Sequence, residues 1–167
     1  MPMSPGQAAS AGGTTVPHRL IYLLVDRSPR NRWRQEANRR IDTGILGRCG
    51  PGDTVVLIYL RPEFIPEDCV RFIYEFPPDL PAYHATPTNQ EQFYAVAQSL
   101  AAVWGQIDAD RARLSAYLAE PVPAEEDQYA AVDFAGGLKY AADSLVTSSG
   151  FDEKHLIFFG PLPTSVP

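Results

Sequence analysis

Hydrophobic positions along the chain follow the pattern of a small sheet whose strands alternate with helices. Residues 19–26 and 54–60 are almost continuous apolar runs, which is typical of strands buried on both faces of a parallel sheet. Residues 155–159 form another such run, and we expect this last strand to be buried as well. Residues 69–76 alternate between apolar and polar side chains, which predicts a half-exposed strand.

A helix is predicted over residues 29–46, between the first two strands. Ser28 followed by Pro29 has the residue types of an N-cap and a first helical position. Apolar residues then recur every four positions, at Trp33, Ala37, Ile41 and Ile45. A strand, a helix and a second strand of these lengths form a right-handed unit with two parallel strands, so the predicted fold class is α/β.

Two further helices are predicted after the third strand. Residues 88–91, with the sequence TNQE, have the pattern of a capping box, and an apolar stripe continues from there to about residue 118. Acidic residues at 125–127 favour a helix start, which predicts a helix that runs to about residue 146. Adjacent glycines at 136–137 indicate that this helix approaches the sheet closely.

The chain is predicted to hold one domain with a tail at each end. Residues 1–18 consist mainly of Gly, Ser, Ala, Thr and Pro, which bury too little apolar surface to offset the entropy of ordering, so we expect a flexible tail there. The domain spans residues 19–161, and residues 162–167 form a C-terminal tail. The linker before residues 69–76 is too short for a helical crossover, so we expect this strand to pair antiparallel at an edge of the sheet.

Composition narrows the class of protein. A chain of 167 residues that is 45% hydrophobic can bury a core without the help of disulfides or a structural metal. Its two cysteines, Cys49 and Cys69, cannot form a disulfide framework or a four-cysteine zinc site. The net charge of −6 argues against a general nucleic-acid binder. The chain has no apolar run that would span a bilayer and no signal-peptide pattern, so we expect a cytoplasmic protein.

Positive charge is concentrated near the N-terminus. Residues 1–48 hold eight arginines and three acidic residues, whereas the rest of the chain carries a net charge of −11. The predicted first helix and the residues before it hold most of these arginines together with a tryptophan: Arg27, Arg30, Arg32, Trp33, Arg34, Arg39 and Arg40. This set is either a solvated helix face or a docking face for an acidic partner, a phosphate group or another copy of the chain.

Three short segments resemble motifs of the von Willebrand factor A domain. The sequence DRSPR at residues 26–30 is similar to the family's D-x-S-x-S, GDTV at residues 52–55 to G-D-x-V, and VDFAGGLKYA at residues 132–141 to T-D-L-x-x-G-L-x-x-A. The order of the segments also agrees, and the resemblance covers residues 19–161. It implies a minimal three-layer α/β/α domain with strand order 3-2-1-4 and helices on both faces of the sheet.

The resemblance also implies where a metal ion would bind, because the family holds a divalent ion with Asp, Ser and Thr oxygens. Asp26 and Ser28 match two of these ligands, whereas Arg30 and Val132 replace a Ser and the Thr. A guanidinium at Arg30 would pair with Asp26 and exclude the ion. We therefore expect a degraded metal-ion-dependent adhesion site and no cofactor.

A metal-dependent hydrolase is the alternative interpretation. Asp26 and Asp133 are candidate Mg²⁺ or Mn²⁺ ligands of the kind that PIN-like and NYN-like nucleases use, and Ser28 is a third candidate ligand. Such nucleases gather three or four acidic residues, more than this chain places at its predicted strand ends. No arrangement of nucleophile and base is evident in the sequence, so no catalytic residue is assigned.

The favoured function is a protein–protein interaction or assembly domain without catalysis. The candidate contacts are the loops at the carboxyl ends of the strands and the arginine-rich face. The strand at residues 155–159 is predicted to be an uncovered edge of the sheet, which a second copy or a partner's strand would cover. We expect a protein partner or self-association rather than nucleic acid.

Overall fold

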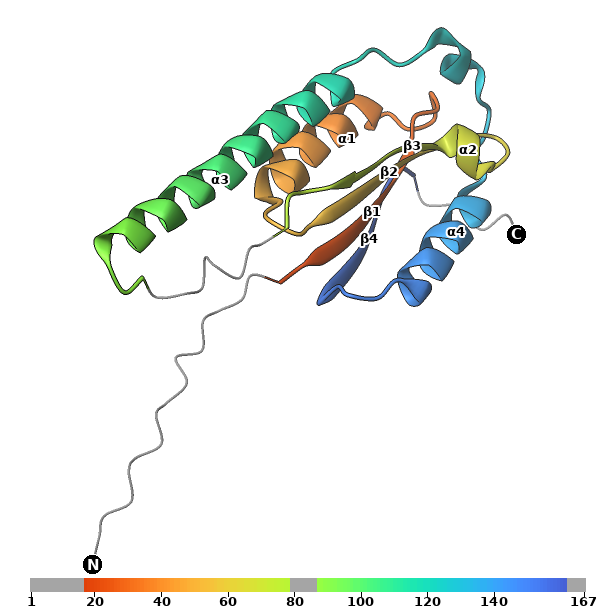
Figure 1. The fold of residues 1–167 in the computed structure, drawn as a ribbon. Coiled ribbons are helices and arrows are strands. Elements are labelled where there is room, and N and C mark those ends of the chain that lie inside the picture. The colour runs from red at the N-terminus through yellow and green to blue at the C-terminus, as the bar shows by residue number, and fades with distance from the viewer. Residues whose placement is uncertain (1–16, 79–86, 162–167) are drawn as a thin grey trace, which may run out of the picture.

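β1 (Arg19–Asp26) lies between two parallel neighbours in a four-stranded sheet of the computed structural model, which describes residues 17–78 and 87–161 (Figure 1). These neighbours are β2 (Thr54–Leu60) and β4 (Glu153–Phe159), and β3 (Val70–Glu75) pairs with β2 antiparallel. The α/β class, the strand order 3-2-1-4 and the antiparallel third strand are confirmed. The predicted tails lie almost entirely outside the described residues.

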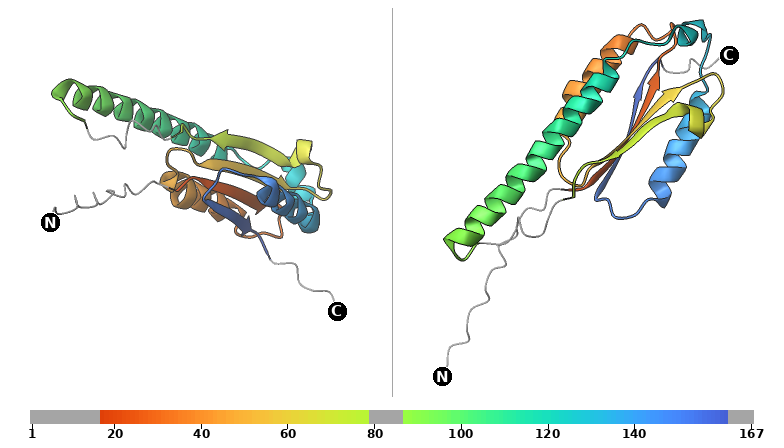
Figure 2. Two further views of the ribbon diagram at one scale, coloured as in Figure 1. Left: turned by 60° about the horizontal axis from the view of Figure 1, so that its bottom comes forward. Right: turned by 45° about the horizontal axis from the view of Figure 1, so that its top comes forward.

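Helices cover both faces of the sheet (Figures 1 and 2). One face carries α3 (Gln90–Leu118) and α1 (Arg34–Arg40), which continues as the π-helical turn η1 (Ile41–Ile45) and the 3₁₀ turn η2 (Leu46–Arg48). The other face carries α4 (Phe134–Thr147), and the one-turn helix α2 (Pro66–Cys69) lies between β2 and β3. None of the helices in the described ranges is long and apolar enough to cross a membrane.

The side chains of β1 alternate between two hydrophobic cores, as the pleat of a strand requires. The core on the α1 and α3 side contains Ile21, Leu23 and Val25, whereas the core on the α4 side contains Leu20, Tyr22 and Leu24. β1 and β2 are buried along almost their whole length, as their continuous apolar runs predicted.

The first helix starts later than predicted, at Arg34 rather than Pro29. The Asp26 carboxylate accepts a hydrogen bond from the Ser28 N–H (2.8 Å), and the Asn31 side chain donates to the Asp26 carbonyl (2.6 Å). These side-chain bonds hold the backbone in turns and compete with helical hydrogen bonds. Ser28 is therefore not an N-cap.

The apolar stripe of the first helix is shorter than predicted. Trp33 precedes α1 and is 64% exposed, because it lies in the turns that replace the expected first helical residues. Ala37 and Ile41 are buried as expected. The helical turns continue to Arg48, two residues past the predicted end.

α3 begins one residue later than its capping box predicted. Asn89, not Thr88, is the N-cap, and its side chain accepts a hydrogen bond from the Gln92 N–H (2.8 Å). The Gln92 side chain accepts from the Thr88 N–H (3.0 Å), so the return bond goes to the residue before the N-cap and the capping box is only partly formed. The helix ends at Leu118, as predicted.

The acidic residues at 125–127 form the 3₁₀ turn η4 (Ala124–Gln128) instead of the start of the last helix. α4 begins after this turn with Asp133 as its N-cap, because the Asp133 carboxylate accepts a hydrogen bond from the N–H three residues later (2.9 Å). A Cβ at Gly137 would collide with Leu60 of β2, so this glycine allows α4 to approach the sheet closely, as predicted.

β4 is an edge strand and is more exposed than its apolar sequence predicted. Its first four residues are exposed, and Leu156 is 36% exposed. In the part of the chain that the structure describes, β4 pairs only with β1. The predicted position of this strand at an edge of the sheet is confirmed, but the expectation that it is buried was wrong for its exposed start.

Hydrogen bonds to the Asp53 side chain connect the amino end of β1 to the turn before β2. Its buried carboxylate accepts hydrogen bonds from the Arg19 N–H (2.9 Å), the Arg19 guanidinium (2.5 Å) and the Gly50 N–H (2.8 Å). His18, which the sequence placed in the tail, belongs to the fold. Its backbone N–H donates to the Asp152 carboxylate (2.9 Å), and its carbonyl accepts from the Asp152 N–H (2.9 Å).

Candidate functional site

Two of the three candidate metal ligands, Asp26 and Asp133, accept hydrogen bonds from nearby backbone N–H groups. Asp26 is buried, and its Oδ1 accepts from the Ser28 N–H (2.8 Å). The Ser28 hydroxyl is buried without a hydrogen-bond partner among the described residues. Oδ1 of Asp133 accepts from the Gly136 N–H (2.9 Å) at the start of α4. Each carboxylate therefore uses an oxygen to satisfy a backbone N–H.

Arg30 does not pair with Asp26, which corrects the expectation from the sequence. Its guanidinium donates to the Ala130 carbonyl (3.2 Å) and connects the turns after β1 to the loop before α4. In residues 17–78 and 87–161, no group of three or more His, Cys, Asp or Glu side chains is placed to hold a metal ion. Of the five oxygen ligands that the von Willebrand factor A family uses, the sequence keeps Asp26 and Ser28, and Arg30 and Val132 replace a Ser and the Thr.

Neighbouring acidic residues neutralise much of the arginine-rich face. Arg34 pairs with Asp127 of η4 (2.6 Å), while Arg39 and Arg40 both pair with Glu36 (2.5 and 3.1 Å). Hydrogen bonds from Arg39 and Arg40 lower the pKa of Glu36 to about 2. These arginines already have partners within the chain, so an acidic ligand would have to compete with them.

Arg27 does not belong to the exposed arginine face. Only 6% of its surface is exposed, and it pairs with Glu126 of η4. Its burial corrects its assignment to a docking face for a protein partner, because the domain covers this guanidinium and leaves it only a small cavity. Arg32 and Trp33 are exposed, so they remain available to a partner.

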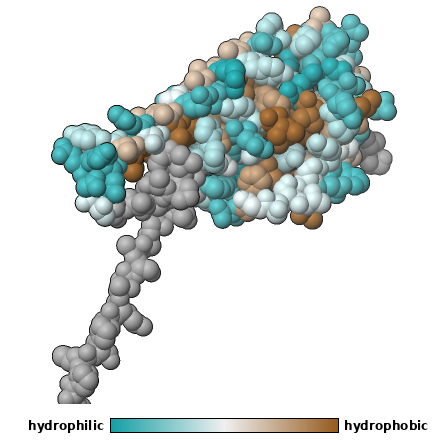
Figure 3. Space-filling view, viewed as in Figure 1, coloured by the Kyte–Doolittle hydropathy of each residue, from teal (hydrophilic) through white to brown (hydrophobic). Residues whose placement is uncertain are grey.

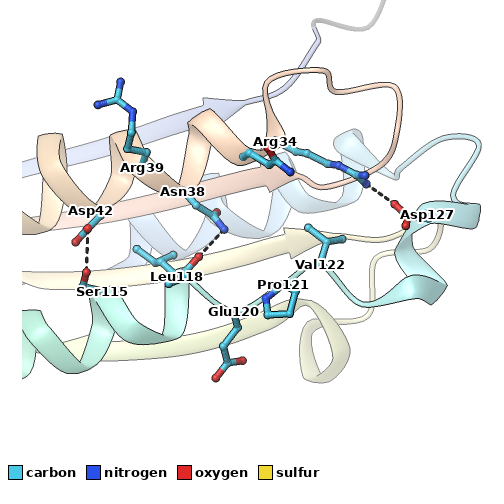
Figure 4. Close-up of a pocket in the computed structure, with 12 residues that line it drawn as sticks. Arg34, Asn38, Arg39, Asp42, Ser115, Leu118, Glu120, Pro121, Val122 and Asp127 are labelled. Atoms are coloured by element: carbon cyan, nitrogen blue, oxygen red, sulfur yellow. Dashed lines mark hydrogen bonds and ion pairs between the residues drawn. The ribbon is translucent and has the colours of Figure 1, made fainter.

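A cavity of about 610 Å³ lies between α1 and the C-terminal end of α3 (Figure 4). The Asn38 side chain donates to the Leu118 carbonyl across it (2.8 Å), and the Ser115 hydroxyl donates to the Asp42 carboxylate (2.9 Å). Asn38 also satisfies a carbonyl of the last turn of α3, which has no partner within the helix. The polar groups of this cavity therefore serve mainly to connect α1 to α3.

The N-terminal part of α3 is a large apolar surface. We call residues 90–106 the outer half of α3 and residues 107–118 the inner half. The outer half extends past the sheet (Figure 2), and four of its large apolar side chains are between 38% and 58% exposed: Phe93, Tyr94, Leu100 and Trp104. Between Glu91 and Asp108 the sequence has no charged residue.

The surface around α3 differs from its tip. In the view of Figure 3 the tip is hydrophilic, whereas hydrophobic atoms lie along the helix and gather where Figure 1 places β3. On β3, Ile73 is 60% exposed. On this face of the molecule, apolar surface thus lies along the long helix and where β3 lies.

A buried charged cluster, which the sequence did not predict, lies at the carboxyl ends of β1 and β2. Arg27 Nε lies 3.0 Å from Glu126 Oε2, and Arg71 Nη2 lies 3.7 Å from Glu126 Oε1. The Arg27 guanidinium stacks over Tyr59, 4.1 Å from the ring centroid. In the sequence, Glu126 is one of three consecutive acids that look alike, so only the fold distinguishes the buried one.

Comparison with protein-family models, with curated proteins and with solved structures finds no match for this chain. A function has to be argued from the chain's own surfaces. Two of these depart furthest from an ordinary structural role, namely the apolar outer half of α3 and the buried charged cluster.

Proposed function

We propose that this protein is a non-catalytic assembly domain of von Willebrand factor A-like type that associates with a second copy of itself through the outer half of α3. The exposed apolar surface of that half carries the proposal. The similarity to the family, which the motifs at residues 26–30, 52–55 and 132–141 support, supplies the interpretation of the scaffold. The interface itself is argued from the helix.

The length of α3 exceeds what the sheet can cover. Its 29 residues span about 43 Å at a rise of 1.5 Å per residue. The seven residues of β2 span about 23 Å. Roughly half of the helix therefore lies beyond the sheet, although apolar residues continue along it from Ile107 back to Phe93.

A solvated helix of this composition would be poorly stable by itself. Most helical stability in proteins comes from packing of an apolar face, and four large apolar side chains of the outer half are left exposed. Removal of apolar surface from water by a partner also stabilises the complex by about 25 cal/mol for each Å² that is buried. A partner that covers Leu100 and Trp104 would stabilise the outer half by both effects.

The missing charges favour a second copy as that partner. Residues 92–107 are uncharged, whereas the whole chain carries a net charge of −6, so two copies repel each other least where these helices meet. Two outer halves that cross on a two-fold axis present the same neutral apolar surface to each other. The β4 edge suits pairing less well, because Glu153, Lys154 and His155 place polar side chains along its exposed start.

The test is the molar mass in solution, measured by light scattering over a wide range of protein concentration. We expect the wild type to approach the mass of a dimer as concentration rises and Leu100→Glu and Trp104→Glu to stay monomeric, because each variant buries a charge in the interface. Val146→Glu, at a position on α4 that is 83% exposed, is the matched control and should dimerise like the wild type.

Two results would contradict this proposal. One is a wild type that remains monomeric at every concentration, and the other is a dimer that survives both glutamate substitutions. We also expect dimerisation to be the same in EDTA and in millimolar Mg²⁺, because the proposed interface contains no metal ligand. A dimer that forms only with Mg²⁺ would shift the interface to Asp26 and Asp133.

A further inference from the structure

We propose that the buried charged cluster is a binding site for a phosphate group that carries a hydroxyl. The site is a cavity of about 210 Å³ beyond the carboxyl ends of β1 and β2. Its lining includes three arginines, a tyrosine and three glutamates: Arg27, Arg61, Arg71, Tyr117, Glu120, Glu125 and Glu126. This site lies at the opposite end of α3 from the proposed dimer interface, so the two proposals stand independently.

Three different elements bring the arginines together. Arg27 and Arg61 each follow directly after a strand, β1 and β2, at the end of the sheet where α/β folds commonly bind ligands. Arg71 comes from the start of β3, which runs antiparallel and therefore begins at that same end. The topology thus places three guanidinium groups around one cavity.

A shift in strand pairing turns Arg71 toward the site. Leu57 pairs with Phe72, but the next residue, Ile58, pairs with Val70, so Arg71 is left out of the register. Such a bulge re-aims a side chain and is frequent beside functional sites. As a result the Arg71 guanidinium lies over Tyr59, 5.7 Å from the ring centroid, on the face of the sheet that α3 covers.

The polar atoms in the cavity are only partly satisfied by the protein. Arg27 Nε and Nη2, Arg61 Nε and Arg71 Nε are buried, and they have no hydrogen-bond partner among the described residues. Both carboxylate oxygens of Glu126 are in the same condition, although Arg27 lies within ion-pair distance. A buried polar network of this kind is costly unless a further group completes its hydrogen bonds.

The innermost charges of the cluster favour an anion. Arg27 and Arg71 together face a single buried carboxylate, that of Glu126, which leaves one positive charge uncompensated among the innermost groups. The other charges lie toward the rim, where Arg61 pairs with Glu125 (3.5 Å) and the exposed Glu120 also lines the cavity. Planar guanidinium groups bind phosphate oxygens with paired hydrogen bonds, so a phosphate group supplies the acceptors that Arg27 and Arg71 lack.

Glu126 determines which oxyanion fits. Its oxygens only accept hydrogen bonds, so the ligand must also donate one. A phosphate with a remaining hydroxyl donates to Glu126 and accepts from the arginines, whereas sulfate at neutral pH has the same shape but no proton to donate. Sulfate would place an anion against Glu126 with no hydrogen bond to offset the repulsion. The site is therefore expected to prefer phosphate over sulfate.

Titration calorimetry of the full chain with inorganic phosphate and with sulfate, at equal ionic strength and near neutral pH, tests this inference. We expect phosphate to bind at least about ten-fold more tightly than sulfate, a factor that corresponds to about 1.4 kcal/mol. Methyl phosphate forms a third arm. An affinity for methyl phosphate equal to that for inorganic phosphate would identify a phosphorylated small molecule as the ligand class. A much lower affinity than for inorganic phosphate would identify the free ion as the ligand.

The variants separate a built site from non-specific charge. Arg71→Gln should weaken phosphate binding by at least about ten-fold, whereas Arg32→Gln, at an exposed arginine outside the cluster, should leave it unchanged. Glu126→Gln should abolish the preference for phosphate over sulfate. If Glu126→Gln does not fold, the comparison of Arg71→Gln with Arg32→Gln decides alone. Absence of phosphate binding, equal affinity for sulfate, or an unchanged affinity in Arg71→Gln would each overturn the proposal.

Discussion

The two halves of α3 carry apolar residues along the same face, interrupted at Asp110, but have different surroundings. In the inner half, Ile107, Leu114 and Leu118 are buried in the core against the sheet. In the outer half, the residues that continue the stripe are largely exposed. Periodicity therefore identifies the apolar face of a helix, but it does not show how far the surface that covers this face extends.

Asp110 lies on the inner side of the boundary between the halves. Its buried carboxylate accepts hydrogen bonds from Gln106 and Arg113, both 3.0 Å long. The Arg113 guanidinium in turn lies over Tyr74 of β3, 5.4 Å from the ring centroid. The inner half thus combines apolar packing with polar contacts to the sheet, whereas the outer half relies chiefly on its own backbone hydrogen bonds and its N-cap.

Truncation of one leucine in each half gives the largest expected contrast. Leu114→Ala should lower the free energy of unfolding by about 2–5 kcal/mol, because it leaves a cavity in the core. Leu100→Ala should cost about 0.5 kcal/mol in dilute solution, because its side chain is already 38% exposed. Urea unfolding at low and high protein concentration measures both effects.

Concentration sharpens the same comparison. If the outer half is a dimer interface, the cost of Leu100→Ala grows at high concentration, whereas the cost of Leu114→Ala does not depend on the interface. Equal costs for the two substitutions in dilute solution would mean that the outer half is packed within one molecule.

Asp110 should give the next largest effect. Asp110→Asn removes the charge from two hydrogen bonds and should cost about 1–2 kcal/mol near neutral pH. Asp108→Asn is the matched control, because Asp108 lies on the exposed side of the helix and, among the described residues, pairs only with Arg111 on the same helix. Its cost should be about 0.5 kcal/mol or less.

Acid should erase the difference between the wild type and Asp110→Asn. Burial raises the pKa of Asp110. Hydrogen bonds from Tyr74 and Gln106 and the charge of Arg113 together outweigh this effect, so the pKa of Asp110 lies below its usual value. A carboxylate with a lowered pKa adds stability above the pKa of the unfolded chain and loses it as pH falls through the folded value. The advantage of the wild type should therefore be constant from pH 7 to about 5 and shrink below about 4. An advantage that persists in acid would show that Asp110 acts by packing alone.

The sheet was predictable because its information is local. β1 and β2 are continuous apolar runs and the linker before β3 is short, so the α/β class and the antiparallel third strand follow from pattern and spacing. The strand order 3-2-1-4, in contrast, was implied by the resemblance to the von Willebrand factor A domain. Helix starts were less predictable. The pattern of Ser28 and Pro29 favours an N-cap, but the Asp26 and Asn31 side chains hold turns there, a competition that depends on the end of the strand before them.

The site residues were predictable in type but not in surroundings. Asp26 and Asp133 do lie at a strand end and a helix start, yet each satisfies a backbone N–H. The sequence predicted Arg27 as part of an exposed arginine face. In the fold it is buried with Glu126 and Arg71, which are about 100 and 44 positions away in the sequence. Contacts of such sequence separation leave no trace in local periodicity.

The two helix caps provide the smallest but most local comparison. Asn89 caps the outer half of α3, and Asp133 caps α4, which packs on the sheet. Substitution of a cap by alanine typically costs about 1 kcal/mol. Asp133→Ala should show this full cost in global unfolding, because α4 unfolds together with the sheet.

Asn89→Ala should show less than half of that cost in global unfolding of the monomer, because the outer half can fray without exposing the core. Its effect should appear instead in amide hydrogen exchange, which should accelerate across residues 92–104 and stay unchanged in the inner half. At concentrations where the dimer forms, amide exchange in residues 92–104 should slow in the wild type. The loss in free energy of unfolding caused by Asn89→Ala should then rise toward that of Asp133→Ala, because fraying of the outer half also opens the interface. Exchange that is equally slow in both halves at low concentration would mean that the outer half needs no partner, which would remove the physical reason for the proposed dimer.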